Sequence, residues 1–363
     1  MRSNSQVLEI TNYQLQIIAN RKFVKHSAQS DRLRKLVEAF PRLTVTVMAD
    51  LVADEFIYGE ISRVSREAPV LILKHRERTV VPGGGANAVC NLADLGVAVL
   101  PVGVIGDDEP GRLLLRRFRQ KRIATSGVLK LKGYVTVTKT RILAGMTHTA
   151  RQQVVRVDRE PESELSFIHQ QDLVDAAKRF LRASDALLVS DYGYGSATPQ
   201  MLKDLRSRGA TKDIPVTLDS RYRLLEYAGA TAATPNEPEV EQALGVRIGN
   251  DSMRLFDAGK KILERMKLES LVITRGRDGM VAFGRRQMPV EIPIFGGDQV
   301  ADVTGAGDTV IATFTAALAA GADTEDAARL ANYAGGIVVM KRGTATVSPE
   351  ELLRAIEQAG PGA

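Results

Sequence analysis

The chain has 363 residues, which is long enough for one large α/β domain with an elaboration or for two domains. Its 44% hydrophobic and 25% charged residues are typical of a soluble globular protein, and no apolar run reaches the roughly 18 residues of a membrane span. A formal net charge of +6 indicates attraction for anionic ligands, but aromatic residues are only 5% of the chain and no long basic run is interleaved with them, which disfavours nucleic acid as a partner.

The N-terminus lacks the apolar core of a signal peptide. A single cysteine, Cys90, excludes an intramolecular disulfide framework and fits a reducing cytoplasm, and one cysteine with four histidines gives little support for a structural zinc site. We therefore expect a cytoplasmic protein without disulfides.

Residues 1–42 are expected to form a helical extension ahead of a main domain at 43–363. Apolar residues recur at helical spacing over Val7–Ile18 and Leu33–Phe40, and Pro41 ends the second segment. We expect this extension to pack on the body or on a partner subunit.

The body begins with a β-branched run, Leu43–Met48, which predicts a buried strand followed by Asp50 and Asp54. Two charged, alternating segments, at about 56–81 and 134–157, predict the strands of a second, smaller sheet. We expect these two blocks to pair and form a lid.

Helices and strands alternate regularly from Leu173 to Thr274. This alternation predicts an α/β fold of Rossmann-like type, with a mainly parallel sheet and helices on both faces. Towards the C-terminus we expect two helices over Gly321–Val339 and a third over Ser348–Glu357.

Polar clusters follow directly on several predicted strands. They are Asp50 with Asp54, Asp191, Asp219, Asn236 with Glu239, Thr274–Gly276, and Asp302–Asp308. Because the carboxyl ends of parallel strands meet at one edge of a sheet, the sequence predicts a ligand site there.

The last cluster, Asp302–Asp308, contains two glycines and precedes a run of small apolar residues that begins at Thr309. A glycine loop that enters a helix N-terminus binds anions, because the first N–H groups lack helical partners and the helix dipole is positive there. Asp308 has two interpretations, an ordinary N-cap or a general base aimed at a hydroxyl that attacks the bound phosphate.

Two other clusters also have structural alternatives. Asn236 and Glu239 have the spacing of a capping box, or they act on magnesium through water. Thr274–Gly276 could form a simple turn.

Four motifs in this order resemble the ribokinase-like (PfkB) carbohydrate kinase family, over residues 44–357. They are Pro-Gly-Gly-Gly-Ala-Asn at 82–87, Thr-Pro-Asn-Glu-Pro-Glu at 234–239, Thr-Arg-Gly-x-x-Gly at 274–279 and Asp-Val-Thr-Gly-Ala-Gly-Asp at 302–308. Within the family the chain looks most like the heptose-7-phosphate kinases. The residues that carry this closer resemblance are Tyr58–Val70, Thr138–Arg141, Arg151–Asp158 and Asp191–Gly193.

The resemblance implies ATP-dependent phosphorylation of a sugar hydroxyl, with Asp308 as the base and Gly305, Ala306 and Gly307 as the anion hole. The positions that match the sugar-binding residues are Asp54, Gly84 and Asn87, with Asp50 as a further candidate at the end of the same strand. The positions that match the nucleotide site are Asn236, Thr274, Gly276, Gly279, Asn332 and Gly335.

The resemblance also implies ions and further contacts. Asn236 and Glu239 match a motif tied to magnesium and phosphate, and Asp302 and Thr304, with the loop Lys341–Thr346, resemble a potassium site. The candidates for binding a sugar phosphate are Arg63, Lys139, Arg141 and Arg151, because forked guanidinium groups suit phosphate. The alternative for each residue is that it is a solvated charge on the lid surface. A homodimer through the lid is expected, because lids of related kinases pair and an isolated small sheet leaves open edges.

The chain departs from the heptose kinases at Tyr194 and Arg221, where those kinases usually carry lysine. Many relatives continue into a nucleotidyltransferase domain, for which a chain ending at Ala363 has no room, so we expect a single activity. The alternatives are a kinase for another sugar, sugar phosphate or nucleoside, and a non-catalytic sensor of sugar or nucleotide on the same fold.

Overall fold

The computed structural model describes residues 28–145, 152–297, 301–341 and 343–359. The predicted helix Val7–Ile18 and the candidate Arg151 lie outside these residues. Within them, no helix is both long enough and apolar enough to cross a membrane.

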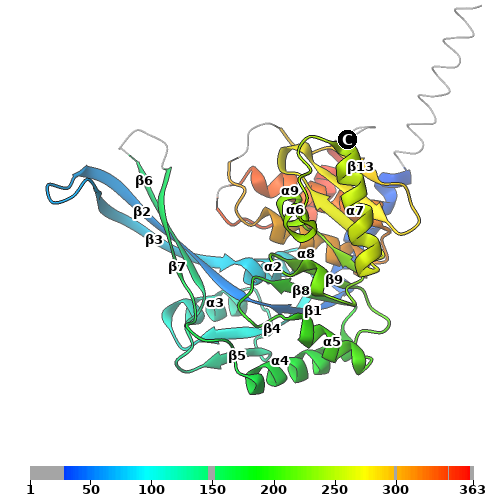
Figure 1. The fold of residues 1–363 in the computed structure, drawn as a ribbon, viewed down its shortest axis with the longest axis horizontal. Helices are drawn as coiled ribbons and strands as arrows, with labels where there is room; N and C mark the ends of the chain where they lie inside the picture. Colours follow the sequence, from blue (N-terminus) through cyan, green and yellow to red (C-terminus); the bar gives the residue numbers. More distant parts are fainter. Residues whose placement is uncertain (1–27, 146–151, 298–300, 342, 360–363) are drawn as a thin grey trace, which may run out of the picture.

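A nine-stranded sheet forms the centre of the molecule, in the order β13-β12-β11-β10-β9-β8-β1-β4-β5 (Figure 1). Its strands are β1 (Thr44–Ala49), β4 (Ala98–Gly106), β5 (Val128–Leu131), β8 (Ala186–Asp191), β9 (Val216–Ser220), β10 (Ala232–Ala233), β11 (Ser270–Thr274), β12 (Met280–Gly284) and β13 (Val290–Ile292). Only β12 and β13 run antiparallel to their neighbours, so the predicted, mainly parallel sheet is confirmed.

Helices cover both faces of this sheet, as expected for an α/β fold. One face carries α2 (Gly84–Asp94), α3 (Glu109–Gln120), α8 (Ala306–Ala319), α9 (Thr324–Val339) and α10 (Pro349–Gln358). The other carries α4 (Phe167–Phe180), α5 (Pro199–Ser207), α6 (Glu237–Leu244) and α7 (Ser252–Met266). Strand β1 shows why two cores form: Val45 and Val47 enter the first, while Met48 enters the second, because neighbouring strand residues point to opposite faces.

The expectation of two helices over Gly321–Val339 was wrong. One helix, α9, runs through the glycine pair Gly335–Gly336. A Cβ on Gly336 would lie 2.1 Å from the carbonyl oxygen of Phe295, so close contact with a neighbouring segment accounts for a glycine inside the helix.

The N-terminal part of the described chain is built into the body. A helix covers residues 28–39 and a 3₁₀ turn follows at Phe40–Arg42. Leu33, Val37 and Phe40 are buried in the same core as residues of α8 and α9, and Arg32 pairs with Asp326 of α9 at 2.9 Å. Within this chain, the second helix of the segment thus packs on the body.

The predicted lid is a separate four-stranded sheet that projects from the body (Figure 1). It consists of β3 (Leu71–Gly83), β2 (Leu51–Val64), β6 (Thr138–Gly145) and β7 (Gln152–Arg159), in that order. The two charged blocks pair through parallel contacts between β2 and β6, as expected. Because a single residue separates the end of β1 from the start of β2, Asp54 lies inside a lid strand and not in a loop of the central sheet.

Candidate active site

The N-terminus of α8 has backbone N–H groups that are free to bind a ligand. Gly305 precedes the helix with φ of 80°, a left-handed conformation that favours glycine, and offers no side-chain cap. Among the described residues, the N–H groups of Gly307 and Asp308 have no hydrogen-bond partner, and no atom lies within 4 Å of the position that a Cβ on Gly307 would take. Free donors at the positive end of a helix dipole are suited to bind an anion.

Asp308 is the third residue of α8, and Gly305 holds the N-cap position, so the N-cap interpretation of Asp308 was wrong. Its side chain is only 4% exposed. Asn87 Nδ2 donates to Oδ2 at 2.9 Å, and the Tyr192 hydroxyl donates to Oδ1 at 2.7 Å.

Burial is the largest cause that raises the pKa of Asp308, to about 7, and the charge of Asp54 acts in the same direction. The hydrogen bonds from Asn87 and Tyr192 and the charge of Lys139 lower this pKa. A carboxylate with a pKa near neutrality is suited to accept a proton at physiological pH.

Asn87 is held in one orientation by a buried hydrogen-bond network. Asn91 Nδ2, one helical turn further along α2, donates to Asn87 O at 3.0 Å and to Asn87 Oδ1 at 3.1 Å. The Thr309 hydroxyl donates to Asn91 Oδ1 at 2.9 Å. Because Asn87 Oδ1 accepts, its Nδ2 must face Asp308, and α2 and α8 are thereby linked.

Two further carboxylates surround the same region. Burial, followed by the negative charges of Glu239 and Asp308, raises the pKa of Asp219 well above its usual value. Burial also raises the pKa of Glu239. A bound cation would relieve the repulsion among these groups.

Asn236 and Glu239 form the capping box that their spacing predicted. Asn236 Oδ1 accepts from Glu239 N at 2.9 Å, and Glu239 Oε2 accepts from Asn236 N at 2.9 Å. Among the described residues, no group of three His, Cys, Asp or Glu side chains is placed to hold a metal directly. Any magnesium role of Glu239 would thus act through water or phosphate.

The lid contributes Asp54, Lys139 and Arg141 to the site. Arg141 Nη1 donates to Asp54 Oδ1 at 2.6 Å, so the two predicted substrate residues pair with each other. Lys139 Nζ lies 5.2 Å from the centre of the Tyr192 ring. Burial, and next the charge of Arg221, lower the pKa of Lys139.

Arg63 is not brought to this place. It is exposed and lies nine residues beyond Asp54 on β2, which corresponds to roughly 30 Å of extended chain. The structure therefore favours the alternative of a solvated lid charge for Arg63.

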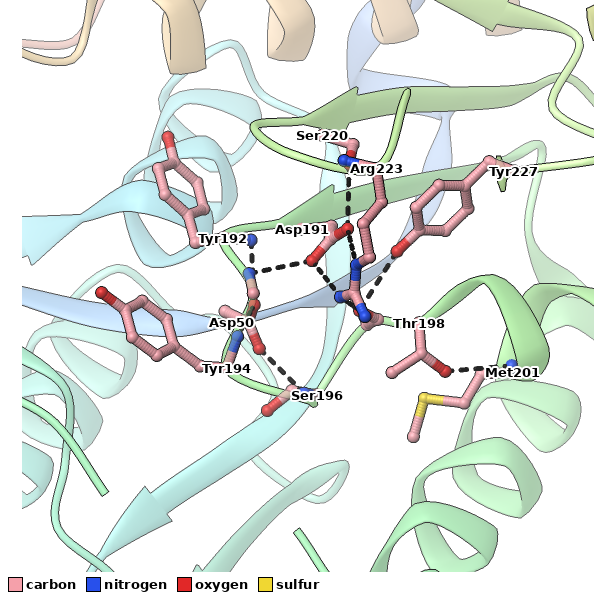
Figure 2. A network of polar contacts seen from close by, with 12 residues as sticks. Asp50, Asp191, Tyr192, Tyr194, Ser196, Thr198, Met201, Ser220, Arg223 and Tyr227 are labelled. Carbon is pink, nitrogen blue, oxygen red and sulfur yellow. Dashed lines mark hydrogen bonds and ion pairs between the residues drawn. The ribbon is translucent and has the colours of Figure 1, made fainter. Parts of the chain in front are cut away.

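The structure gives Asp50 a supporting position, although we expected it to contact substrate. Its carboxylate is buried and accepts from the backbone N–H groups of Tyr192, Tyr194 and Ser196 at 2.9, 2.9 and 2.8 Å (Figure 2). Burial raises the pKa of Asp50 to about 6, against these donors. Both carboxylate oxygens thus accept hydrogen bonds from the loop 192–196, which follows β8.

Asp191 holds the same loop from the opposite side. It accepts from Gly193 N at 2.9 Å, from the Ser220 hydroxyl at 2.9 Å and from Arg223 Nε at 3.1 Å. Figure 2 shows the rings of Tyr192 and Tyr194 on one side of this network and Arg223 on the other.

The predicted nucleotide residues line a cavity of about 380 Å³ next to the α8 N-terminus. Those that line it are Thr274, Gly276, Gly279, Asn332 and Gly335, together with Ala306 and Gly307 of the predicted anion hole. Asn236 is not part of the lining but pairs with Thr274 in a β-bridge. Asn332 Nδ2 donates to the carbonyl oxygen of Pro293 at 2.8 Å, which ties α9 to the segment after β13.

The candidate potassium residues join two loops. Asp302 Oδ1 accepts from Thr304 N at 2.9 Å, and Oδ2 accepts from Gly343 N at 3.2 Å. Each oxygen keeps a second lone pair, so the residues present are compatible with an ion.

Gly84 begins α2 with φ of 48°, and a Cβ there would lie 3.2 Å from Cε2 of Tyr192. It therefore permits the tyrosine ring to approach and is placed near the site as expected.

Tyr192 and Asn91 are the residues of this site that the sequence analysis missed. Tyr192 was noted only within a family motif, and Asn91 lay one helical turn after Asn87, a spacing that could have indicated it.

A polar site at the carboxyl ends of a parallel sheet combines a helix N-terminus with free N–H donors, a buried carboxylate whose pKa is raised to about 7 and an adjoining cavity. These are the features of a kinase that phosphorylates a small molecule. The comparison with known families is more specific. Residues 50–351 match the model of the pfkB family carbohydrate kinases, and the chain belongs to that family.

Two curated relatives of this chain are longer than the stretch that it matches. The chain is 39% identical over 315 residues to the bifunctional protein HldE of Geobacter sulfurreducens, a match that covers 86% of the chain and 63% of that protein. It is 39% identical over 328 residues to the HldE protein of Trichlorobacter lovleyi, covering 89% of the chain and 65% of that protein. The chain thus spans about two thirds of the length of these relatives.

Solved structures agree on the ribokinase-like fold. Arabidopsis thaliana ribokinase, complexed with ribose and ATP, superposes with a TM-score of 0.67 at 21% identity, over 87% of this chain and 98% of that one. Escherichia coli phosphofructokinase-2, in complex with potassium, superposes with a TM-score of 0.68 at 16% identity, again over 87% and 98%.

Proposed function

We propose that this carbohydrate kinase transfers the γ-phosphate of ATP to a hydroxyl of a phosphorylated heptose, converting heptose 7-phosphate to heptose 1,7-bisphosphate. The observation that carries the phosphoryl transfer is Asp308, a buried carboxylate beside two free N–H groups of α8. The HldE relatives at 39% identity support a heptose phosphate as the sugar.

The reaction follows from this arrangement. The sugar oxygen attacks the γ-phosphorus. The bond between the γ-phosphorus and the β,γ-bridging oxygen breaks, and ADP leaves. The hydroxyl proton passes to Asp308, while the N–H groups at the start of α8 stabilise the transferring phosphoryl group. The cavity lined by Thr274, Gly276 and Asn332 would hold the nucleoside part of ATP.

A phosphorylated substrate also suits the charges at the lid. Lys139 is half-buried, and burial, followed by the positive charge of Arg221, lowers its pKa. An anion between these side chains would remove that repulsion and favour the charged lysine. Arg141 contributes less to phosphate binding in this proposal, because it is paired with Asp54.

Magnesium fits the acidic region of the site. Glu239 and Asp219 would hold it through water and the ATP phosphates, and the ion would supply neutralisation of the phosphate charge. For potassium, Asp302 and Thr304 are the proposed residues, and a higher rate in potassium than in sodium salts would support that assignment.

A homodimer through the lid is part of the proposal. On β7, Val155 and Val157 are 45% and 54% exposed and point to the side of the lid opposite Lys139. A second lid would cover these side chains and an open edge of the small sheet.

The test is ADP release with ATP and a panel of sugars: heptose 7-phosphate, unphosphorylated heptose, other sugars and sugar phosphates, and a nucleoside. We expect turnover with heptose 7-phosphate. Turnover with unphosphorylated sugars only would reject the heptose phosphate, and turnover with another sugar phosphate would redefine the substrate. Tight sugar binding without any turnover would make the chain a sensor.

A further inference from the structure

Tyr192 links the end of β8 to the proposed base. It follows β8, and its hydroxyl donates to Asp308 Oδ1 at 2.7 Å. Burial, and next the negative charge of Asp308, raise the pKa of the Tyr192 hydroxyl well above its usual value. The phenol therefore stays protonated and can only donate to the carboxylate.

The backbone of Tyr192 is itself held in place. Its N–H donates to Asp50 Oδ2 at 2.9 Å, and Asp191 fixes the next residue through Gly193 N at 2.9 Å (Figure 2). Its ring lies against Gly84 on one side and under Lys139 Nζ on another. A side chain with these contacts has little freedom to rotate away from Asp308.

Both oxygens of Asp308 thus receive one hydrogen bond from a fixed donor. Tyr192 binds Oδ1, and Asn87 binds Oδ2. A carboxylate oxygen has two lone pairs, so each keeps one for an incoming hydroxyl. The two donors prevent rotation of the carboxylate without saturating it.

We propose that Tyr192 is a positioning residue of the kinase: with Asn87, it fixes the Asp308 carboxylate in one orientation and keeps it ionised for proton transfer from the sugar. This inference rests on the proposed role of Asp308 as the base. Burial alone does not orient a carboxylate. Proton transfer also requires that the acceptor lone pair of Asp308 point at the attacking hydroxyl, and the two donors supply that orientation.

The charges around Asp308 explain why such a donor is needed. Asp54 of the lid and Asp219 of β9 interact with it as like charges. The charge of Glu239 acts on Asp219 and on the Tyr192 hydroxyl. The positive charge of Lys139 opposes them at Asp308, and that of Arg221 opposes them at Asp219. Burial and these acids favour the protonated carboxyl, whereas the Tyr192 and Asn87 donors favour the charged form.

Tyr192→Phe, with Tyr194→Phe as the matched control, tests the inference. Both residues lie on the loop 192–196 and both rings face Lys139 Nζ, at 5.2 and 5.8 Å, but the Tyr194 hydroxyl donates to Glu160 at 2.7 Å and not to Asp308. Phenylalanine preserves the ring and its contact with Lys139, so the first variant removes only the hydrogen bond to the base.

The measurement is kcat as a function of pH with heptose 7-phosphate and saturating ATP, together with KM for ATP and a thermal melt. For Tyr192→Phe we expect kcat at neutral pH to fall about tenfold and the acid limb to move up by about one pH unit, with partial recovery in alkali. KM for ATP should stay unchanged. Tyr194→Phe should keep the wild-type acid limb.

An acid limb of Tyr192→Phe that coincides with that of Tyr194→Phe would overturn the inference, and a lower melting temperature without a shifted limb would assign Tyr192 a structural role only. Asp308→Asn separates this failure from a failure of the proposed function. If Asp308→Asn is inactive, an unshifted Tyr192→Phe refutes only the positioning role. If Asp308→Asn retains its rate, the base is not Asp308 and both proposals are wrong.

Discussion

At the residue scale, the chemistry of the site depends on how one carboxylate is surrounded. Burial of Asp308 destabilises its charged form and raises its pKa, while the hydrogen bonds from Asn87 and Tyr192 stabilise the charged form. The resulting pKa is about 7. A fully solvated aspartate would be a far weaker base. A buried aspartate without donors would stay protonated at neutral pH.

Replacing Asp308 by asparagine should leave ATP binding intact and reduce kcat by roughly 10²–10⁴-fold, because the proton acceptor is lost while the free N–H groups of α8 remain. Single-turnover kinetics and ATP titration measure the two effects separately. A near-normal rate would remove Asp308 from the base role.

The wild-type pH profile should report the same group. The pKa of Asp308 is raised to about 7, and only the ionised form accepts a proton. The rate should therefore be highest above pH 7 and fall towards acid, with an acid limb near neutrality. A rate that is constant from neutral pH down to the ordinary range of aspartate, about 4, would contradict the raised pKa.

At the element scale, the sequence predicted the lid but not its continuity with the body. Two charged blocks were expected to pair, and β2 and β6 do so. The extent of β2, which begins immediately after β1, could not be read from alternation alone. For that reason Asp54 and Asp50, four residues apart, end in different surroundings: Asp54 in the lid beside Arg141, and Asp50 under the loop 192–196.

The exposed valines of β7 supply a test at this scale. Val155→Glu should weaken the proposed homodimer, because a charge would be buried between the lids. Light scattering after size-exclusion chromatography measures the mass across a dilution series. The control is Val246→Glu outside the lid, which changes a side chain of similar exposure, 41% against 45%. Equal masses for the two variants at every concentration would argue against a lid dimer.

At the scale of the whole molecule, the central sheet gathers groups from distant parts of the chain. Asn87, Tyr192 and Asp308 are more than a hundred residues apart in sequence and share two hydrogen bonds. The order of strands places the ends of β1, β8 and β9 side by side, which explains why the polar residues after them meet.

The N-terminal helix offers a test of the boundary that we drew at residue 42. Phe40 is fully buried in the core with α8 and α9. Phe40→Ala should lower the free energy of unfolding by roughly 3–5 kcal/mol, with little change in KM, because it leaves a cavity far from the ligand groups. Chemical denaturation measures this effect.

Phe167→Ala is the matched control, since Phe167 is 73% exposed and its loss should change the free energy of unfolding by no more than about 0.5 kcal/mol. Equal effects of the two substitutions would show that residues 28–42 are an appendage and not part of the kinase core.

The sequence by itself predicted the class of fold and the glycine loop before α8, and the resemblance of its motifs to a kinase family implied five residues that line the cavity beside that loop. These features depend on local periodicity and on short motifs, which can be recognised without knowledge of tertiary contacts. Only the tertiary structure decided that Asp50 supports a loop, that Arg63 lies away from the site and that Tyr192 holds Asp308. Each of these depends on contacts across the fold, because the orientation of a polar side chain is decided by the donors and charges that other elements bring to it.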